Sequence, residues 1–436
     1  MSLCILLFVA ALFVTILSGC SKKQPGIIMR RTALIQALLV GMISVSCLGQ
    51  EESGGKTTGS GKGWMDMKTI KLEKGLSVTL SQPVLVARSK ERLWFPTLIN
   101  LEKGKLLAVM SNIPDAWVWP TKAWAAWSSD GGLTWRCDKP LDGLYSDLSA
   151  LRLKNGDRLL LPFYLFTVPG TNGVTGTCPI VRQGQSAFEM VEKGVSVTGW
   201  PRACGSFGEL QGRTLAGFGF NGQNVELKGG GYLATLYGYF EGPKHYSLLA
   251  AESANGRDWR IRSVIADVTS KLQGGGGEGP CESALCRLKD GRLMCVYRNG
   301  GPYWQCWSQD EGKTWTDPVY TITQGAVQPS LAVMKDGTVA LSGGRPGIFV
   351  RFNADGTGKD WQDVDVMAHH NACCPKEPIG SSTSYTEIIA LDERHLLLIY
   401  DRIPGGWGGI AKDSPESNSA WVVRIEVSRD GEKAAR

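Results

Sequence analysis

Short apolar runs separated by glycine-containing turns recur along most of the chain. In the stretch from Gly279 to Trp315, three such runs follow one another: Ser283–Leu288, Arg292–Tyr297 and Tyr303–Trp307. The first turn between them contains Asp290-Gly291. Asp-Gly between two apolar runs is a strong signal for a β-hairpin, because glycine accepts a positive φ without steric cost. The pattern predicts a four-stranded antiparallel sheet that closes on a turn ending in Trp315.

The same strand–turn–strand unit occurs six times. The other five copies are Phe95–Met110, Leu148–Phe163, Val225–Tyr237, Ser330–Ser342 and Thr386–Tyr400. Units that are too small to bury their own apolar face stack on their neighbours to form a continuous core. Six irregularly spaced copies predict an all-β fold, a six-bladed β-propeller of four-stranded antiparallel blades.

A polar turn that ends in tryptophan precedes the last strand of several units. Ser128–Trp135 and Ser308–Trp315 both follow the pattern S-x-D-x-G-x-T-W, and degenerate forms end at Trp259 and Trp361. The aspartate can accept backbone N–H groups within its own turn, the glycine takes a left-handed conformation, and the tryptophan packs onto the sheet. We expect these turns to be structural and their aspartates to have no catalytic role.

Two complete octapeptides of this kind, called Asp boxes, within six four-stranded repeats resemble the sialidase (neuraminidase) superfamily. The resemblance covers about residues 75–430. It implies a six-bladed propeller with the active site at the pseudo-symmetry axis. Asp boxes also occur in non-enzymatic propellers and in other glycosidases and lyases, so the chemistry must be argued from the site itself.

Glu282 and Tyr385 stand at the heads of the fourth and sixth units, where the first strands of the blades converge on the axis. The resemblance implies that Tyr385 is the nucleophile and that Glu282 takes its proton. A neutral nucleophile suits an anomeric carbon that already bears a carboxylate, since a second carboxylate would be repelled. A free phenol has a pKa of about 10, so an adjacent base or cation must help it react near neutral pH.

The resemblance also implies arginines that hold the substrate carboxylate with a planar, bidentate guanidinium. Arg298 and Arg345 follow apolar runs and match the second and third of these arginines. The first unit departs from the family, because Trp94 occupies the place of the first arginine and Arg92 or Arg88 would have to act from the loop. Arg402, in Arg402-Ile403-Pro404, has the family's letters at the wrong end of the fold and is treated as a decoy.

The general acid is not settled by the sequence. Asp115 lies in the expected loop, between the first hairpin and the first Asp box, and is the only acid there. Asp147 and the pair His369-His370 are alternatives. The predicted substrate-binding residues are thus Arg298, Arg345, Arg92, Trp94, Asp147 and His370. Aromatic residues expected near the rim, where they stack on sugars or fill the core, are Trp94, Trp117, Trp119, Trp124 and Trp304.

The N-terminus carries two apparent export signals. One ends in Leu17-Ser18-Gly19-Cys20, which resembles the lipoprotein box, and the other starts at Met29 and ends at Cys47. A basic head, a short apolar run and small residues indicate secretion rather than a spanning helix. We expect residues 1–47 to be export signal, 48–66 a flexible linker and 67–436 the propeller. The protein would then be exported, either to the cell envelope as a lipoprotein or to the periplasm or the exterior, with membrane contact only through a lipid anchor.

Composition narrows the partners and cofactors. The net charge of +6 is scattered over many loops without a dense basic run, so we expect no nucleic-acid partner. The cysteines outside the signals show no C-x-x-C pairs with metal spacing, so we expect no metal, and the resemblance implies no organic cofactor either. We expect a monomer.

The sequence thus predicts an exported glycoside hydrolase that removes a terminal acidic sugar, above all an α-linked sialic acid, with retention through a tyrosyl intermediate. Two alternatives stay open: a divergent propeller glycosidase or lyase for another acidic sugar, and a non-catalytic glycan-binding propeller. A Tyr385–Glu282 hydrogen bond facing a pocket would favour an enzyme. A channel filled by Trp94 would favour a binding protein.

Overall fold

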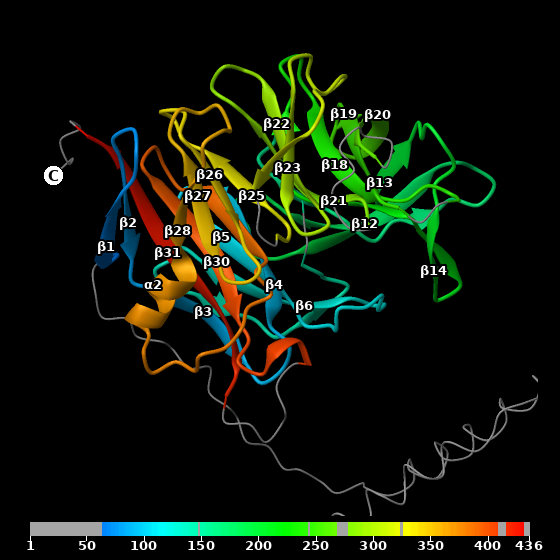
Figure 1. Ribbon diagram of the computed structural model, residues 1–436. Helices are drawn as coiled ribbons and strands as arrows, with labels where there is room; N and C mark the ends of the chain where they lie inside the picture. The colour runs from blue at the N-terminus through cyan, green and yellow to red at the C-terminus, as the bar shows by residue number, and fades with distance from the viewer. Residues whose placement is uncertain are drawn as a thin grey trace, which may run out of the picture. The chain divides into compact units, whose positions relative to one another are not determined.

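The computed structural model describes residues 63–146, 149–242, 245–267, 278–322, 326–408 and 416–430. All of them fall in the unit Thr57–Arg436. The predicted export signals and Asp147 lie outside the described residues. Strands dominate, and the helices among the described residues are α2 (Val366–Cys373) and the 3-10 helix η2 (Gly406–Gly408) (Figure 1). Neither is long and apolar enough to cross a membrane.

The strands form six blades, of which the second and third are joined in one 12-stranded sheet. Blade one contains β4 (Trp94–Glu102), β5 (Lys105–Ser111), β6 (Lys122–Ser128), β7 (Arg136–Cys137) and β8 (Leu141–Asp142). Blade two contains β9 (Ser149–Arg152), β10 (Arg158–Leu161), β12 (Val174–Val181) and β13 (Glu189–Thr198), extended by β11 (Phe166–Thr167), β14 (Ser206–Leu210) and β15 (Arg213–Ala216). Blade three contains β16 (Phe218–Phe220), β17 (Val225–Glu226), β18 (Tyr232–Gly238), β19 (Ser247–Ser253) and β20 (Asp258–Ala266).

The second half of the chain gives the more regular blades. Blade four contains β21 (Pro280–Arg287), β22 (Leu293–Asn299), β23 (Tyr303–Ser308) and β24 (Val319–Ile322). Blade five contains β25 (Ser330–Val333), β26 (Val339–Gly343), β27 (Phe349–Asn353) and β28 (Gln362–Asp365). Blade six contains β29 (Thr386–Ala390), β30 (His395–Arg402), β31 (Asn418–Arg429), β2 (Leu76–Ser81), β1 (Asp66–Lys71) and β3 (Val84–Ser89).

Blade six combines strands from both ends of the described chain. β31 pairs antiparallel with β30 on one side and with β2 on the other, so the blue and red strands of Figure 1 lie in one sheet. Inner strands of neighbouring blades contact one another, β4 with β29, β29 with β25 and β25 with β21. The architecture is the predicted propeller, with its ring closed by the N-terminal strands.

The inner strand of blade three is interrupted between β16 and β17, just before the strand–turn–strand unit that the sequence predicts from Val225. Gly222 lies in this break with φ +78°, and a Cβ there would stand 1.6 Å from the backbone oxygen of Ser283 in β21. Only glycine fits, because any side chain would collide with the neighbouring inner strand. The break lets blade three approach blade four closely at the axis.

The two complete Asp boxes form the same hydrogen-bond network. In each, the aspartate (Asp130 or Asp310) accepts the backbone N–H of the threonine four residues later at 2.9 Å and its hydroxyl at 2.6 Å. The first serine accepts the glycine N–H, at 2.9 Å from Gly132 and 2.8 Å from Gly312. These bonds satisfy the polar groups of the turn locally. The boxes are structural turns, as the sequence predicts.

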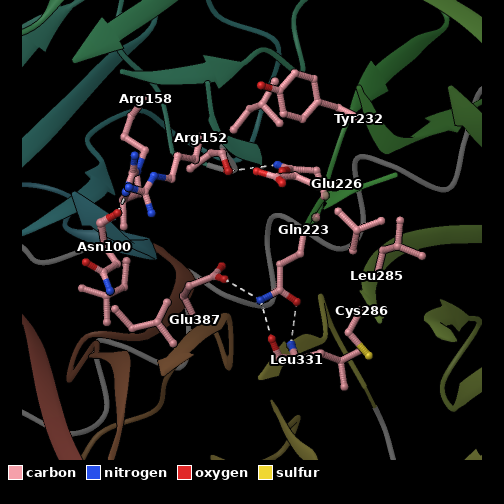
Figure 2. Close-up of a pocket in the computed structure, with 18 of the residues that line it drawn as sticks. Asn100, Arg152, Arg158, Gln223, Glu226, Tyr232, Leu285, Cys286, Leu331 and Glu387 are labelled. Atoms are coloured by element: carbon pink, nitrogen blue, oxygen red, sulfur yellow. Dashed lines mark hydrogen bonds between the residues drawn. The ribbon is translucent and has the colours of Figure 1, made fainter. Parts of the chain in front are cut away.

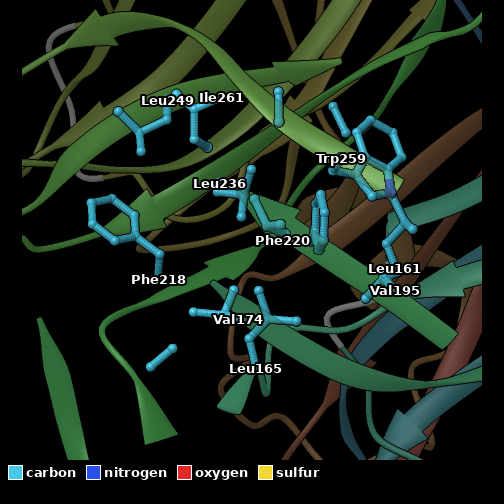
Figure 3. Packing of buried hydrophobic residues seen from close by; sticks show 14 of the residues in the cluster. Leu161, Leu165, Val174, Val195, Phe218, Phe220, Leu236, Leu249, Trp259 and Ile261 are labelled. Atoms are coloured by element: carbon cyan, nitrogen blue, oxygen red, sulfur yellow. The ribbon is translucent and has the colours of Figure 1, made fainter. Parts of the chain in front are cut away.

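Figure 3 shows the cluster of buried hydrophobic residues that lies between blades two and three. Phe218 and Phe220 of β16 are fully buried, and Trp259, which ends a degenerate Asp box, packs 5.2 Å from the Phe220 ring (Figure 3). The Trp259 indole N–H also donates to Gly256 O at 2.9 Å. Full burial of such a side chain contributes roughly 1.5–3 kcal/mol. The tryptophan thus fixes its turn to the sheet.

Candidate active site

A cavity of about 390 Å³ opens near the N-terminal ends of the inner strands. Its volume lies in the range of roughly 300–1,000 Å³ that is typical of small-molecule sites. The charged and reactive groups in its wall are Glu278, Glu282, Arg298, Arg345 and Tyr385 from blades four to six, and Asp115 from the loop between β5 and β6 in blade one. The sequence predicted all of these residues except Glu278, and the structure brings all six to one cavity.

Tyr385 and Glu282 are in direct contact in this cavity. The Tyr385 hydroxyl donates a hydrogen bond to Oε1 of Glu282. Oε2 of Glu282 accepts Nη1 of Arg298 at 2.9 Å and the backbone N–H of Gln328 at 3.0 Å. With both oxygens held and only 6% of the residue exposed, the carboxylate has a fixed orientation toward the phenol. This is the geometry in which a carboxylate can take a phenolic proton.

The backbone adopts left-handed conformations around this pair. Non-glycine residues with positive φ include Phe95 (+50°), Glu282 (+29°) and Arg345 (+109°), which all line the cavity, and Ser384 (+65°), which precedes Tyr385. The pairing registers of β4 and β21 also shift at Phe95 and Glu282. Such conformations cost about 1–3 kcal/mol each and cluster at functional sites. Here they aim three side chains into one cavity.

Asp401, which sequence reasoning missed, holds two of these backbone segments together. It is fully buried and accepts the hydroxyl of Ser382 at 2.7 Å, the backbone N–H of Thr383 at 2.8 Å, the Thr383 hydroxyl at 2.5 Å and the N–H of Phe95 at 3.1 Å. Burial raises the pKa of the Asp401 carboxyl. One carboxylate thus ties the segment before Tyr385 to the first strand of blade one.

The two predicted arginines have different surroundings. Arg298 pairs with two carboxylates, Glu282 through Nη1 and Glu278 through Nη2. Burial opposes the charge of Arg298, but Glu282 and then Glu278 outweigh it and raise its pKa. Arg345 donates Nη2 to Thr383 O at 3.1 Å, lies 4.9 Å from the Trp407 ring, and forms no ion pair in the part of the chain that is described. Arg345 is therefore the cation with capacity for a ligand anion.

The place expected for the first arginine is aromatic. Trp94 is 1% exposed, donates its indole N–H to Ile113 O at 3.0 Å, and does not line the cavity. Phe95 does line it, with its ring edge-on to Tyr385 at 4.8 Å. Arg92 packs over the Trp94 ring at 5.6 Å and does not line the cavity either. Neither Trp94 nor Arg92 is placed where it could touch a ligand there.

The general-acid candidates differ in their position relative to the cavity. Asp115 lines the cavity from the loop between β5 and β6, is exposed, and makes no hydrogen bond or ion pair within the described ranges. Asp147 lies outside the described residues. His370 is away from the cavity in α2, where it is 1% exposed and its Nδ1 lies 2.8 Å from the Tyr400 hydroxyl. Burial lowers the pKa of His370 to about 3. Of the candidates that the structure describes, Asp115 lies in the cavity wall and His370 does not.

The structure also places several residues whose relation to the cavity the sequence did not predict. Glu278 was missed, and the only signal was its position four residues before Glu282 on the same rim. Arg402, treated as a decoy, does not line the cavity and lies in a small pocket with His370 and Trp421. Of the rim tryptophans, Trp117 lines the cavity. No group of three or more His, Cys, Asp or Glu residues suited to a metal ion occurs among the described residues.

A second cavity of about 440 Å³ lies further along the same inner strands. Figure 2 shows Gln223 at its centre, where the side-chain amide donates to Leu331 O at 2.7 Å and to Glu387 at 3.2 Å. Arg158 donates to three backbone carbonyls, those of Asn100, Gly156 and Leu101. These polar groups join neighbouring blades, and none of the predicted catalytic residues lines this cavity.

Comparisons with known proteins bear on the fold. The sequence matches no family model and no curated protein. A protein of unknown function from Dyadobacter fermentans is similar in structure, with TM-score 0.60, 19% identity, and coverage of 81% of this chain and 100% of that one. A Hadza microbial sialidase has TM-score 0.52 at 14% identity, covering 78% of this chain and 66% of that one. A GH93 α-L-arabinofuranosidase of Fusarium graminearum, solved with arabinobiose, has TM-score 0.52 at 15% identity, covering 79% and 98%.

These likenesses, all below 20% identity, concern the fold. The chain shares the propeller architecture of sialidases and GH93 arabinofuranosidases, so the predicted six-bladed propeller is confirmed, and the resemblance to the sialidase superfamily is confirmed for the fold. The fold is one that carries glycoside hydrolases of different specificity, and a fold by itself does not select among them.

Proposed function

We propose that the protein is a retaining glycoside hydrolase in which Tyr385 is the nucleophile and Glu282 its base. The hydrogen bond from the Tyr385 hydroxyl to Glu282, inside a cavity of ligand size, carries this proposal. Trp94 does not line the cavity. A channel filled by Trp94 would have favoured a non-catalytic binding propeller instead. The left-handed backbone at Glu282 and Ser384 supports the proposal further, because such strain is typical of functional sites.

The proposed reaction has two displacement steps. In the first, Glu282 accepts the phenolic proton as the Tyr385 oxygen bonds to the anomeric carbon, and Asp115 donates a proton to the departing glycosidic oxygen. In the second, Asp115 takes a proton from water, the water oxygen replaces Tyr385 at the anomeric carbon, and Glu282 returns the proton to the phenolate. Two inversions give net retention, and sialidases with a tyrosine nucleophile are known exceptions to the two-carboxylate rule.

The proposed substrate is a terminal acidic sugar, above all an α-linked sialic acid. A neutral phenol suits an anomeric carbon that bears a carboxylate, and Arg345 offers a guanidinium without a carboxylate partner in the described chain. A neutral sugar, or another acidic one, is the second candidate. It is favoured by the absence of an arginine at position 94, where Trp94 stands and Phe95 beside it lines the cavity, and by the pairing of Arg298 with two glutamates.

A panel of fluorogenic glycosides tests the proposal. The purified protein should release the fluorophore from an α-sialoside faster than from neutral glycosides, and Tyr385→Phe should abolish the release. Preference for an arabinofuranoside or another neutral sugar would select the second candidate. Absence of turnover across the panel would favour the glycan-binding propeller.

Export is proposed on the sequence alone. The apolar runs that end at Cys20 and Cys47, the second behind Arg30 and Arg31, support secretion with lipidation of a cysteine. Mass spectrometry of the mature N-terminus in its native host should find a lipid-modified cysteine. An unprocessed chain in the cytosol would refute the proposal.

A further inference from the structure

Arg298 is bound by two protein carboxylates inside the cavity. Its Nη1 donates to Glu282 Oε2 at 2.9 Å, and its Nη2 donates to Glu278 Oε2. Its Nε is buried and makes no hydrogen bond within the described ranges of the chain. A ligand carboxylate binds a guanidinium best through two parallel N–H groups on neighbouring nitrogens. Any such pair in Arg298 includes a nitrogen that a glutamate already holds.

The two glutamates differ in how firmly they are held. Glu282 has both oxygens engaged by three donors, as described above, and its side chain is 8% exposed. The side chain of Glu278 is 46% exposed, and Arg298 is its only side-chain partner among the residues that the structure describes. The Glu278 carboxylate can leave Arg298 by breaking one ion pair, whereas the Glu282 carboxylate would have to give up three bonds.

The backbone of Glu278 is nevertheless fixed at the rim of the cavity. Its carbonyl oxygen accepts the N–H of Tyr246, just before β19 of blade three, at 2.8 Å. Gly279 follows with φ +92°, and a Cβ there would stand 2.6 Å from the backbone oxygen of Tyr246. Only glycine allows this close contact. Glu278 thus keeps its place beside Arg298, while its exposed carboxylate can turn away.

Glu278 changes what a ligand meets at this part of the cavity. A ligand carboxylate beside Arg298 would stand next to the Glu278 carboxylate, and the two negative charges would repel each other. A ligand hydroxyl would meet no such repulsion, because it can donate a hydrogen bond to the same carboxylate. Arg345, which forms no ion pair in the described part of the chain, does not impose this choice.

We propose that Glu278 is a specificity-determining residue that competes with a ligand carboxylate for Arg298. While Glu278 is in place, an acidic sugar is bound through Arg345 and gains Arg298 only by displacing Glu278. The preference of the cavity for acidic over neutral sugars is thereby lowered. The inference rests on the proposed function in taking an acidic sugar as the ligand. It adds that the protein's own carboxylate limits the binding of this sugar.

Binding of a matched pair of ligands tests this role. The pair is the methyl α-glycoside of sialic acid and the analogue in which a hydroxymethyl group replaces its carboxylate. Calorimetry on the full-length protein in the Tyr385→Phe background measures both affinities while turnover is suppressed. Glu278→Gln should tighten binding of the acidic glycoside roughly tenfold, the effect of one hydrogen bond to a charged group, and should not tighten binding of the neutral analogue. Glu278→Ala, which empties the position, should act at least as strongly.

Glu189→Gln is the matched control. The Glu189 side chain is 54% exposed and pairs with Arg182 in blade two, and neither residue lines the cavity. Its replacement changes the net charge of the protein as much as Glu278→Gln does. A gain in Glu189→Gln as large as that in Glu278→Gln would therefore assign the effect to overall charge and overturn the role of Glu278.

The outcomes separate this inference from the proposed function. Tighter binding of the acidic glycoside in both Glu278 variants, without hydrolysis of any sialoside by the wild type, would support the role of Glu278 while the proposed function fails. Hydrolysis of sialosides by the wild type, with unchanged or weaker binding in the Glu278 variants, would overturn the role and leave the proposed function in place. Absence of acidic-glycoside binding in the Tyr385→Phe background and in both Glu278 variants would also overturn it.

Discussion

The Tyr385 hydroxyl is hydrogen-bonded to Oε1 of Glu282, although the two residues belong to different blades and lie 103 positions apart in the sequence. The opposite oxygen of Glu282 is bound by Arg298 and by the backbone of Gln328. These bonds prevent the carboxylate from rotating away from the phenol. A base that is held in this way needs no rearrangement before it accepts a proton.

Tyr385→Phe should leave the fold intact and lower kcat by roughly three orders of magnitude or more, because the reacting oxygen is removed while the ring and its packing remain. Initial rates on the preferred glycoside and a thermal unfolding curve check this. Tyr400→Phe is the matched control, since Tyr400 is also a blade-six tyrosine but its hydroxyl contacts His370 outside the cavity. Substantial activity in Tyr385→Phe would place the nucleophile elsewhere.

Glu282→Gln should damage the same chemical step, because glutamine cannot accept the phenolic proton. Residues that act as a unit have strongly non-additive effects on rate, so the double variant with Tyr385→Phe should be about as slow as the worse single one. Rates of both single variants and the double variant decide this. Losses that multiply would mean that the two residues act in separate steps.

Arg345→Ala should weaken the binding of an acidic sugar roughly ten- to hundredfold, since a hydrogen bond to a charged group contributes about 1.5–3 kcal/mol. Binding of the neutral analogue should change far less. Arg345→Lys should recover only part of the loss, because an ammonium lacks the planar fork of a guanidinium. Arg136→Ala, at an exposed arginine in blade one, is the control. Equal losses for acidic and neutral ligands would show that Arg345 supports the wall rather than binding a carboxylate.

Asp401→Asn should lower both stability and kcat. An amide nitrogen cannot accept a hydrogen bond, so some of the four donors around Asp401 lose their acceptor. Each buried donor left without a partner costs about 1–3 kcal/mol. Denaturant unfolding and kcat together test this, with Asp142→Asn on the exposed strand β8 as control. Unchanged unfolding would show that Asp401 does not hold the two segments.

Asp310→Asn should make stability less dependent on acid pH. The Thr314 hydroxyl and backbone N–H lower the pKa of Asp310 to about 2, below its value of 3.8 in an unfolded chain. A depressed carboxyl pKa stabilises the fold above pH 4, and this contribution is lost as the pH falls toward 2. The difference in unfolding free energy between wild type and variant should therefore shrink over that range. If the difference in unfolding free energy stayed constant over this pH range, titration of Asp310 would not be its cause.

The sequence by itself determined the propeller fold and the meeting of Glu282 with Tyr385. The aspartate of an Asp box is hydrogen-bonded to a threonine only four residues later. Each hairpin is likewise specified by its own turn. The six units can therefore be recognised in the sequence without knowledge of their neighbours. The inner strands of a propeller all converge on its axis. Residues at the heads of those strands, such as Glu282 and Tyr385, therefore meet there, whatever the loops between them.

Only the tertiary structure decided what surrounds that pair. Asp401 accepts the N–H of Phe95 across 306 residues, Arg298 is shared with Glu278, and Trp94 is turned into the core while Phe95 faces the cavity. The pattern of apolar and polar residues does not predict these contacts. They depend on left-handed backbone conformations at single positions and on the blade that each loop packs against. Local patterns specify turns and strands, whereas the chemistry of a ligand cavity is set by side chains that meet only after the ring has closed.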